Sequence, residues 1–312
     1  MVLLSHPMGN ANVRAIAAAL ERNEMLDSFH TSIATFPGNL WDRLGGVSPL
    51  ADFRRRSFAT NLRQKTHQYP YRELGRMVSA KAGLASLSAG EKGPFCVDRV
   101  YHSLDRKVAA YLGSRAGQDV RMVYAYEDGA LASFQAAKKR GIACIYDLPI
   151  AYWGTGHRLL EEEAERLPEW AVTLGGGISD SARKRQRKDE ELALADAVVG
   201  PGSFVMDSLP AWASNKQRIV APFGSPQVHS PAPAAAPNAT TTLKNRPLRV
   251  LFAGSMGQRK GLGDLFAAVR SLPAGSIELV VLGGPQAPMS FYRQQYADFR
   301  HEGRRPHAEV LQ

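Results

Sequence analysis

The chain has 312 residues, of which 44% are hydrophobic and 22% charged, as in a globular protein that buries a core in about two domains. Its formal charge of +10 favours an anionic partner, such as a nucleotide, a lipid surface or nucleic acid. No helix-turn-helix, zinc-finger or RNA-binding signature accompanies that charge, so specific nucleic-acid binding is unsupported and we expect none.

The sequence also bears on where the protein works. Its two cysteines are too few for a disulfide framework and suggest a reducing compartment. No apolar stretch approaches the roughly 20 residues of a membrane span, and residues 1–7 lack the basic start of a secretory signal. We therefore expect a cytoplasmic protein. Basic residues interleaved with aromatic ones at 53–71 leave association with a membrane surface open, although we favour an ordinary solvated face there.

The first 36 residues have the pattern of a β-α-β unit. Residues 2–6 are typical of a buried strand, a helix follows with Asn12 as its expected N-cap, and 28–36 is predicted to be a second strand. The turn at Gly9 and Asn10 follows the carboxyl end of the first strand, where open α/β sheets bind ligands. Gly9 and Asn10 are therefore candidate binding residues, with a plain turn as the alternative.

Two further predicted strands, 121–125 and 142–146, have acidic residues after them. The first leads to Glu127 and the second to Asp147. If the strands are parallel, both carboxylates lie at one rim of the sheet, close to the Gly9 turn. Each could face a ligand there or cap the helix that follows, and the sequence leaves both interpretations open.

Residues 248–271 contain the clearest local motif. An apolar strand over 248–253 leads into the turn Gly254-Ser255-Met256-Gly257, and an amphipathic helix follows. This arrangement turns backbone N–H groups and a helix N-terminus toward an anion. Arg259 and Lys260 add positive charge where a diphosphate would bind, unless they are merely solvated.

The order of the motifs resembles a known superfamily. Ala195-Asp196 begins a short apolar strand, Ser203 follows, a strand ends in Pro222-Phe223-Gly224, and Lys260-Gly261 comes later. This succession is similar to that of the retaining GT-B glycosyltransferases of the glycogen-synthase-like superfamily (glycosyl transferases group 1). Phe223 stands where that family usually has Asn.

The resemblance implies an α/β fold with two Rossmann-like, doubly wound parallel-sheet domains. Residues 1–224 would form the N-terminal, acceptor-binding domain and 225–247 a linker rich in Pro, Ala and Thr. Residues 248–312 would form part of the C-terminal domain, which binds the nucleotide sugar.

The resemblance also implies roles for individual residues. In the family the matching Lys holds the donor diphosphate, and Asp147 stands where many members have a His that points into the cleft, which makes it the candidate catalytic residue. Ser255 replaces a frequent Arg, for which Arg259 could substitute. The candidate donor-binding residues are Gly254, Ser255, Arg259, Lys260 and Gly283; those on the acceptor side are Gly9, Asn10 and Glu127.

The expected function is transfer of a sugar from a nucleotide-sugar donor to an acceptor hydroxyl, with retention. No Asp-x-Asp occurs, and no His, Cys and carboxylate cluster has metal-ligand spacing, so we expect no metal and no other cofactor. The acceptor would be a saccharide or a lipid-linked molecule. The alternative is a non-catalytic nucleotide-binding or scaffold paralogue. A dehydrogenase is disfavoured because Gly-x-Gly-x-x-Gly does not follow the first strand.

The C-terminal part is short for a complete doubly wound domain, which needs about 100 to 150 residues. The family's Glu-x7-Glu element, which holds the donor sugar and ribose, does not occur after Leu248. We therefore expect a chain truncated within its second domain that does not turn over a nucleotide sugar, with an N-terminal domain that folds alone.

Overall fold

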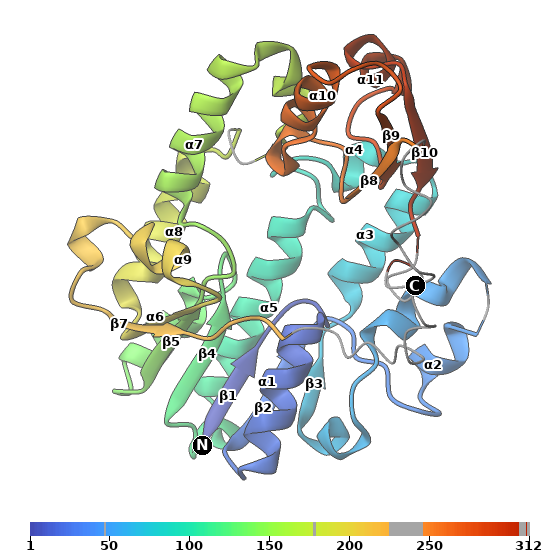
Figure 1. The fold of residues 1–312 in the computed structure, drawn as a ribbon. Helices are drawn as coiled ribbons and strands as arrows, with labels where there is room; N and C mark the ends of the chain where they lie inside the picture. Colours follow the sequence, from blue (N-terminus) through green and yellow to red (C-terminus); the bar gives the residue numbers. More distant parts are fainter. Residues whose placement is uncertain (47, 177–178, 225–245, 306–309, 311–312) are drawn as a thin grey trace, which may run out of the picture. The chain divides into compact units, whose positions relative to one another are not determined.

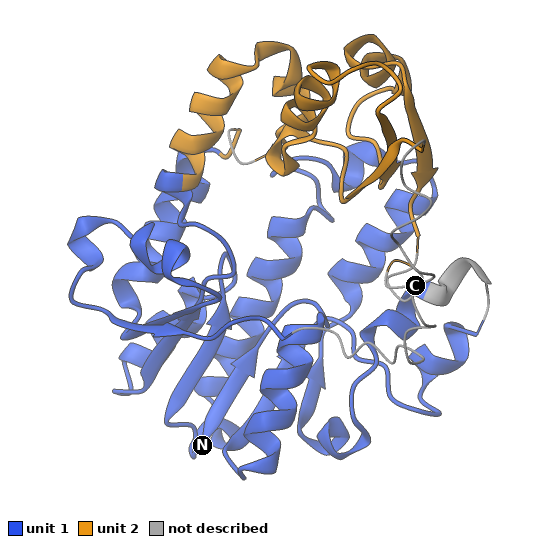
Figure 2. Ribbon diagram, in the orientation of Figure 1, with its two compact units in different colours: residues 1–155, 181–224 blue, residues 156–180, 225–312 orange. Residues whose placement is uncertain are grey.

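The computed structural model describes residues 1–46, 48–176, 179–224, 246–305 and 310. The chain forms two compact units (Figure 2): residues 1–155 with 181–224 make the first, and 156–180 with 225–312 the second. Of the linker predicted at 225–247, residues 225–245 lie outside the described part.

The first unit is built on a seven-stranded sheet in the order β3-β2-β1-β4-β5-β6-β7 (Figure 1), and every neighbouring pair is parallel. The order reverses between β1 and β4, which is the topological switch point of a doubly wound fold. The strands are β1 (Val2–Ser5), β2 (Leu26–Thr31), β3 (Thr66–Gln68), β4 (Met122–Tyr126), β5 (Ala143–Asp147), β6 (Ala197–Gly200) and β7 (Gln217–Val220).

Helices cover both faces of this sheet, as a parallel sheet requires. Leu3 packs on one face with residues of α5, α6, α8 and α9, and its neighbours Val2 and Leu4 pack on the other with residues of α1. The helices are α1 (Ala11–Arg22), α2 (Leu40–Leu44), α3 (Tyr71–Lys81), α4 (Ala85–Ser88), α5 (Val97–Leu112), α6 (Leu131–Lys138), α8 (Ala182–Leu194) and α9 (Ser203–Asp207), with 3-10 turns η1 (Ser48–Arg56), η2 (Thr60–Lys65), η3 (Arg115–Gly117) and η6 (Ala211–Ala213).

Two predictions for the first β-α-β unit were wrong in detail. The N-cap of α1 is Asn10 and not Asn12, because the preceding turn leaves Asn10 extended and its Oδ1 accepts a 2.8 Å hydrogen bond from the Val13 N–H. Strand β2 ends at Thr31 and not at residue 36, because β1 is only four residues long and its pairing stops at Ser5 opposite His30.

The second unit contains a smaller parallel sheet in the order β10-β9-β8, so the predicted α/β class with two parallel sheets is confirmed. Its elements are β8 (Leu248–Ala253), η8 (Gln258–Lys260), α10 (Leu262–Arg270), β9 (Ile277–Leu282), α11 (Met289–Gln295) and β10 (Phe299–Gly303). The sequence suggested a helix over 290–303. The structure instead turns into β10 after α11, because Phe299 is buried against Phe266 and pairs with Leu279 of β9.

Residues 156–180 belong to the second unit, whereas the prediction placed them in an N-terminal domain of 1–224. They include most of α7 (Trp153–Arg166) and η4 (Pro168–Thr173). Trp170 explains the difference, because it is 2% exposed and packs on the rings of Phe266, Phe291 and Tyr292. The segment thus supplies a core residue to the second unit, although in the sequence it comes after β5 and before β6, which belong to the first unit.

Within the described residues, no helix combines the length and apolar character needed to cross a bilayer. Nor does that part of the chain bring together three or more His, Cys, Asp or Glu side chains that could hold a metal ion.

Candidate functional site

The turn after β8 is held close to the end of β9. A Cβ atom on Gly283 would lie 1.7 Å from the carbonyl oxygen of Gly254, so only glycine allows the two backbones to approach this closely. The Gly254 N–H donates to the Leu282 carbonyl. The carboxyl ends of β8 and β9, with two of the predicted donor-binding glycines, therefore meet at one rim of the smaller sheet.

Buried Gln258 fixes the next part of this turn. Its backbone N–H donates to Thr173 Oγ1 at 2.9 Å, and its Oε1 accepts from the Gly263 N–H at 2.8 Å. Its Nε2 donates to Glu163 and Asp264, both at 2.6 Å. Because every polar group of Gln258 is bonded, the η8 turn is anchored both to α10 and to the segment that contains α7.

The two predicted cations emerge from this anchored turn. Arg259 and Lys260 are exposed, and neither forms an ion pair with a described residue. Gly261, with φ at +72°, adopts the left-handed conformation that starts α10 directly after them. Ser255 is exposed at the same turn. The arrangement presents positive charge, glycine backbone and a hydroxyl at the carboxyl rim of a parallel sheet.

Sequence analysis missed two residues at this rim. His301 of β10 contacts the Gly283 carbonyl oxygen through Nε2 at 2.9 Å, and it was overlooked because 290–303 suggested a helix. Gln258 was overlooked because a lone Gln beside two cations carries no signal of its anchoring role in the sequence.

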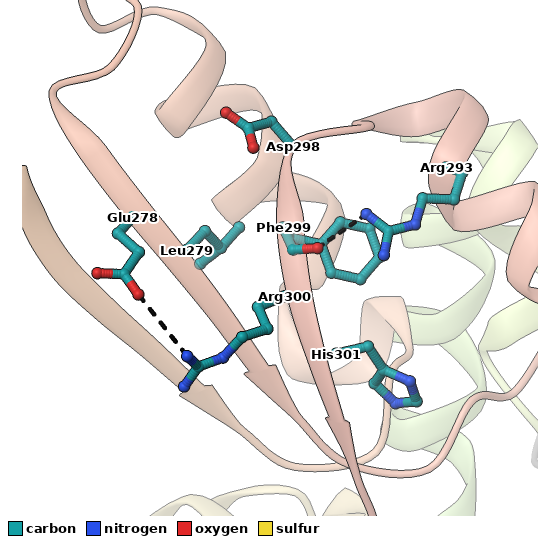
Figure 3. Close-up of a pocket in the computed structure, with 7 residues that line it drawn as sticks. All are labelled: Glu278, Leu279, Arg293, Asp298, Phe299, Arg300 and His301. Carbon is teal, nitrogen blue, oxygen red and sulfur yellow. Dashed lines mark hydrogen bonds and ion pairs between the residues drawn. The ribbon is translucent and has the colours of Figure 1, made fainter.

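A separate cavity of about 510 Å³ follows the edge strand β10 (Figure 3). Arg300 forms ion pairs with Glu278 and Glu302, and Arg293 lies 4.0 Å from the centre of the Phe299 ring while donating to the Phe299 carbonyl. The charges around this cavity are thus largely satisfied by one another, and we assign it no binding role. Its lining residues are Glu278, Leu279, Arg293, Asp298, Phe299, Arg300 and His301.

The first unit has a cavity of about 360 Å³ at the carboxyl rim of its sheet, the rim at which the sequence analysis placed its candidate acceptor-side residues. Of the four candidates on this side, Asn10 and Asp147 line the cavity, whereas Gly9 and Glu127 do not. The lining residues are Asn10, Asn12, Val13, Ala15, Ile16, Tyr124, Tyr126, Asp147, Pro149, Ile150, Val199, Gly200, Pro201, Ala221, Pro222, Phe223 and Gly224.

Glu127 and Gly9 have other contacts. Glu127 is 5% exposed and accepts a 2.7 Å hydrogen bond from buried Lys188. Burial lowers the pKa of Lys188, but the carboxylates of Glu127 and Asp128 more than offset this effect and hold the pKa above its ordinary value. Gly9 lies against Phe58, whose ring atoms would be 2.9 Å from an added Cβ.

Burial raises the pKa of both rim carboxyl groups, but Asp147, unlike Glu127, forms no ion pair with a described residue. Burial raises its pKa to about 7; the Tyr124 hydroxyl lowers the pKa by hydrogen bonding, and the charge of Glu127 raises it. A carboxylate whose pKa is close to neutral can hold or release a proton near physiological pH, which suits it to contact a hydroxyl group.

We expect Asp147→Asn to gain stability relative to the wild type as the pH rises from about 4 to about 7. Over that range the folded protein keeps the Asp147 proton while the unfolded chain releases it, so the wild type loses stability with each pH unit and the amide does not. Urea unfolding at several pH values in this window measures the difference. The same series on surface Asp119→Asn is the control, and a constant difference for Asp147→Asn would contradict the assignment.

The sequence matches no protein-family model and no curated protein. Among solved structures, the chain is similar to sucrose-phosphate synthase from Thermosynechococcus elongatus, with 14% identity over 99% of this chain and 72% of that one and a TM-score of 0.49. The lipopolysaccharide outer core galactosyltransferase WaaB gives 11% identity, coverages of 99% and 69% and a TM-score of 0.48. UGT2 of Phytolacca americana, complexed with UDP-2-fluoro-glucose and pterostilbene, is 12% identical over 97% of this chain and 71% of that one, with a TM-score of 0.45. Similarity of this degree concerns the fold alone and identifies no family. The fold assignment itself rests on the strand order of the two sheets.

Proposed function

We propose that the protein is a GT-B glycosyltransferase that binds the diphosphate of a nucleotide sugar at the η8 turn and transfers the sugar, with retention, to an acceptor hydroxyl. The observation that carries the proposal is the turn anchored by Gln258, which presents Arg259 and Lys260 without a described counterion beside Gly254 and Gly283. The motif resemblance over 195–261 supports the same assignment.

The chemistry follows from charge. When the bond between the sugar and the diphosphate breaks, negative charge develops on the leaving phosphate, and a cation held at that position lowers the barrier. Lys260 supplies that cation, Arg259 a second one, and Ser255 a hydroxyl donor. Asp147, in the first unit, accepts a hydrogen bond from the acceptor hydroxyl that attacks the anomeric carbon. No metal ion is required, because the two side chains provide the positive charge.

Cytoplasmic location and association with a membrane surface through the basic residues of 53–71 stay predictions. The alternative function, a nucleotide-binding or scaffold protein without turnover, shares the donor site and differs only in the reaction.

We expect Lys260→Ala to weaken UDP binding at least tenfold, equivalent to about 1.4 kcal/mol, because it removes a cation from the diphosphate. Isothermal titration calorimetry with UDP measures this effect, and uridine, which lacks the diphosphate, should bind equally to both proteins. Lys107→Ala, on the exposed face of α5, is the matched control. Binding should persist in EDTA.

Two results would count against the proposal. Equal UDP affinity of wild type and Lys260→Ala would contradict the diphosphate assignment, and loss of binding in EDTA with recovery in Mg²⁺ would contradict metal independence. Transfer is measured with UDP-glucose and other nucleotide sugars as donors. UDP binding with no transfer from any of these donors would favour the non-catalytic alternative.

A further inference from the structure

The walls of the 360 Å³ cavity in the first unit are mainly apolar. Val13 and Ile16 contribute from α1, and Ile150 and Phe223 from the segments after β5 and β7. Ile150 is 48% and Phe223 50% exposed, so two large apolar side chains are left in contact with solvent at one small cavity. Large exposed apolar groups that gather at one concave site indicate ligand binding.

Phe223 marks a departure from the resembled family, whose pattern has Asn at this place. An amide can hydrogen-bond a sugar hydroxyl, whereas a phenyl ring can only pack against an apolar or aromatic surface. The exchange therefore removes polar recognition from the cavity and adds a flat apolar wall.

The lining of the cavity also carries few charged groups. Asp147 is the one ionisable carboxylate among the described lining residues, and these include no Lys, Arg or His. Nearby His6 packs on the Tyr126 ring at 4.4 Å, and its burial lowers its pKa to about 4, so it is neutral at physiological pH. Burial raises the pKa of Tyr124 and Tyr126, which also stay neutral.

The buried cation Lys188, which pairs with the other rim carboxylate, Glu127, cannot compensate an anionic ligand either. Lys188 is occupied by Glu127 and Asp128, at 2.7 and 3.1 Å. A phosphate or carboxylate in the cavity would therefore meet Asp147 without a described cation beside it. Above about pH 7 Asp147 is ionised and repels a second negative charge, and below that pH the anion still loses hydration with no cation to offset the loss.

We propose that this cavity binds an uncharged aromatic or aliphatic group that carries a hydroxyl, and that it discriminates against phosphorylated or carboxylated molecules. The inference rests on the proposed function in one respect: it makes this group the acceptor end of the glycosyl-transfer reaction. Asp147 and Asn10 supply the polar contacts to the hydroxyl, and Ile16, Ile150 and Phe223 supply the apolar wall.

The test compares two probes that share one ring system. 2-Naphthol is uncharged at neutral pH, and 2-naphthyl phosphate carries the same rings with an anionic ester. In saturation-transfer NMR titrations without nucleotide at pH 8, where Asp147 is ionised and 2-naphthol is still uncharged, we expect 2-naphthol to bind at least tenfold more tightly than 2-naphthyl phosphate. Asp147→Asn should reduce the difference in affinity between the two probes. The substitution removes the negative charge that repels the phosphate and leaves the shape of the side chain nearly unchanged.

A pair of substitutions on α1 locates the binding. Ala15 is exposed and lines the cavity, whereas Ala11 is exposed on the same helix and does not line it. Ala15→Trp should weaken 2-naphthol binding at least tenfold and Ala11→Trp should leave it unchanged. Circular dichroism checks that both variants are folded.

The inference is overturned if 2-naphthyl phosphate binds as tightly as 2-naphthol, if neither probe binds, or if Ala15→Trp and Ala11→Trp behave alike. The titrations with the two naphthyl probes do not depend on the proposed donor site, because they contain no nucleotide. Failure of UDP to bind, with 2-naphthol binding intact and sensitive to Ala15→Trp, would refute the proposed function and keep the cavity's ligand class.

Discussion

Replacing Lys188 by Met is expected to destabilise the first unit by about 3–5 kcal/mol, the usual cost of breaking a buried ion pair by removal of one partner. Lys188 Nζ lies 2.7 Å from Glu127 Oε1, and the two side chains are 7% and 6% exposed. Met retains most of the volume of Lys, so the expected loss comes from the uncompensated buried carboxylate and not from a cavity.

Urea unfolding followed by circular dichroism measures this loss. The double variant Lys188→Met/Glu127→Gln should recover part of the stability, because it removes the more deeply buried carboxylate together with Lys188 and leaves only the Asp128 carboxylate, which is 16% exposed, without its partner. Lys107→Met, at an exposed position of α5, should change the free energy of unfolding by less than about 0.5 kcal/mol. A single variant as stable as the wild type, or a double variant no better than the single, would show that Glu127 does not depend on Lys188.

The Lys188 pair belongs to a set of charges on α8 whose partners lie partly on other helices. Arg187 of α8 bonds Asp105 of α5 at 2.6 Å and Glu191 of its own helix at 3.1 Å. The pair of Arg187 and Glu191 has the i,i+4 spacing that can be recognised in the sequence. Helical spacing alone could not show that this face of α8 packs inward, because the partner Asp105 lies on another helix.

The N-terminus of α6 shows the same limit of prediction. The Ala130 and Leu131 N–H groups donate to Glu191, and the Ala132 and Ser133 N–H groups donate to Asp105. Carboxylates from two other helices therefore cap α6, a role that the sequence had offered to Glu127. Caps supplied from distant parts of the chain leave no local signal, unlike a Ser or Asn at the N-cap itself.

Most strands could be predicted because the local signal was strong. The apolar run 197–200 is buried in a parallel sheet and contains few polar residues, so its type and position follow from the sequence. The run 248–253 also forms the expected strand, although its side chains are exposed or only half-buried. Short elements such as β3, with one exposed residue between two half-buried ones, carry no such run. Strand β3 exists because it pairs with β2, and a pairing between distant segments cannot be recognised without the fold.

The two rim carboxylates illustrate how far a site can be predicted. Parallel strands place both chain positions at one edge, and Tyr126 indeed pairs with Asp147. Which way each carboxylate points depends on its partners. Asp147 faces the cavity beside Tyr124, whereas Glu127 is held by Lys188. The sequence could therefore locate the rim and could not separate the ligand-facing residue from the structural one.

Trp170→Ala is expected to destabilise the second unit by about 3–5 kcal/mol, the usual cost of removing a large aromatic side chain from a core. The ring contacts Phe266, Phe291 and Tyr292, with centroid distances of 5.8, 5.1 and 6.0 Å. Its loss leaves a cavity between η4 and the rest of the unit. Limited proteolysis should then cut within 156–180 and 246–305 while the first unit stays resistant, and the matched control Trp212→Ala, at a 51% exposed position, should behave like the wild type.

The same substitution should also weaken UDP binding, although Trp170 lies outside the proposed donor contacts. The reason is the chain of contacts behind Lys260: the Trp170 carbonyl accepts from Thr173 Oγ1, and Thr173 Oγ1 in turn accepts from the Gln258 N–H that anchors the η8 turn. Thr173→Val separates the two effects, because it keeps Trp170 in the core and removes only the hydroxyl. We expect Thr173→Val to lower UDP affinity with little change in protease resistance. If it instead leaves UDP affinity unchanged, then η8 holds its conformation without this anchor, and the cations at 259 and 260 are positioned by the β8 turn alone.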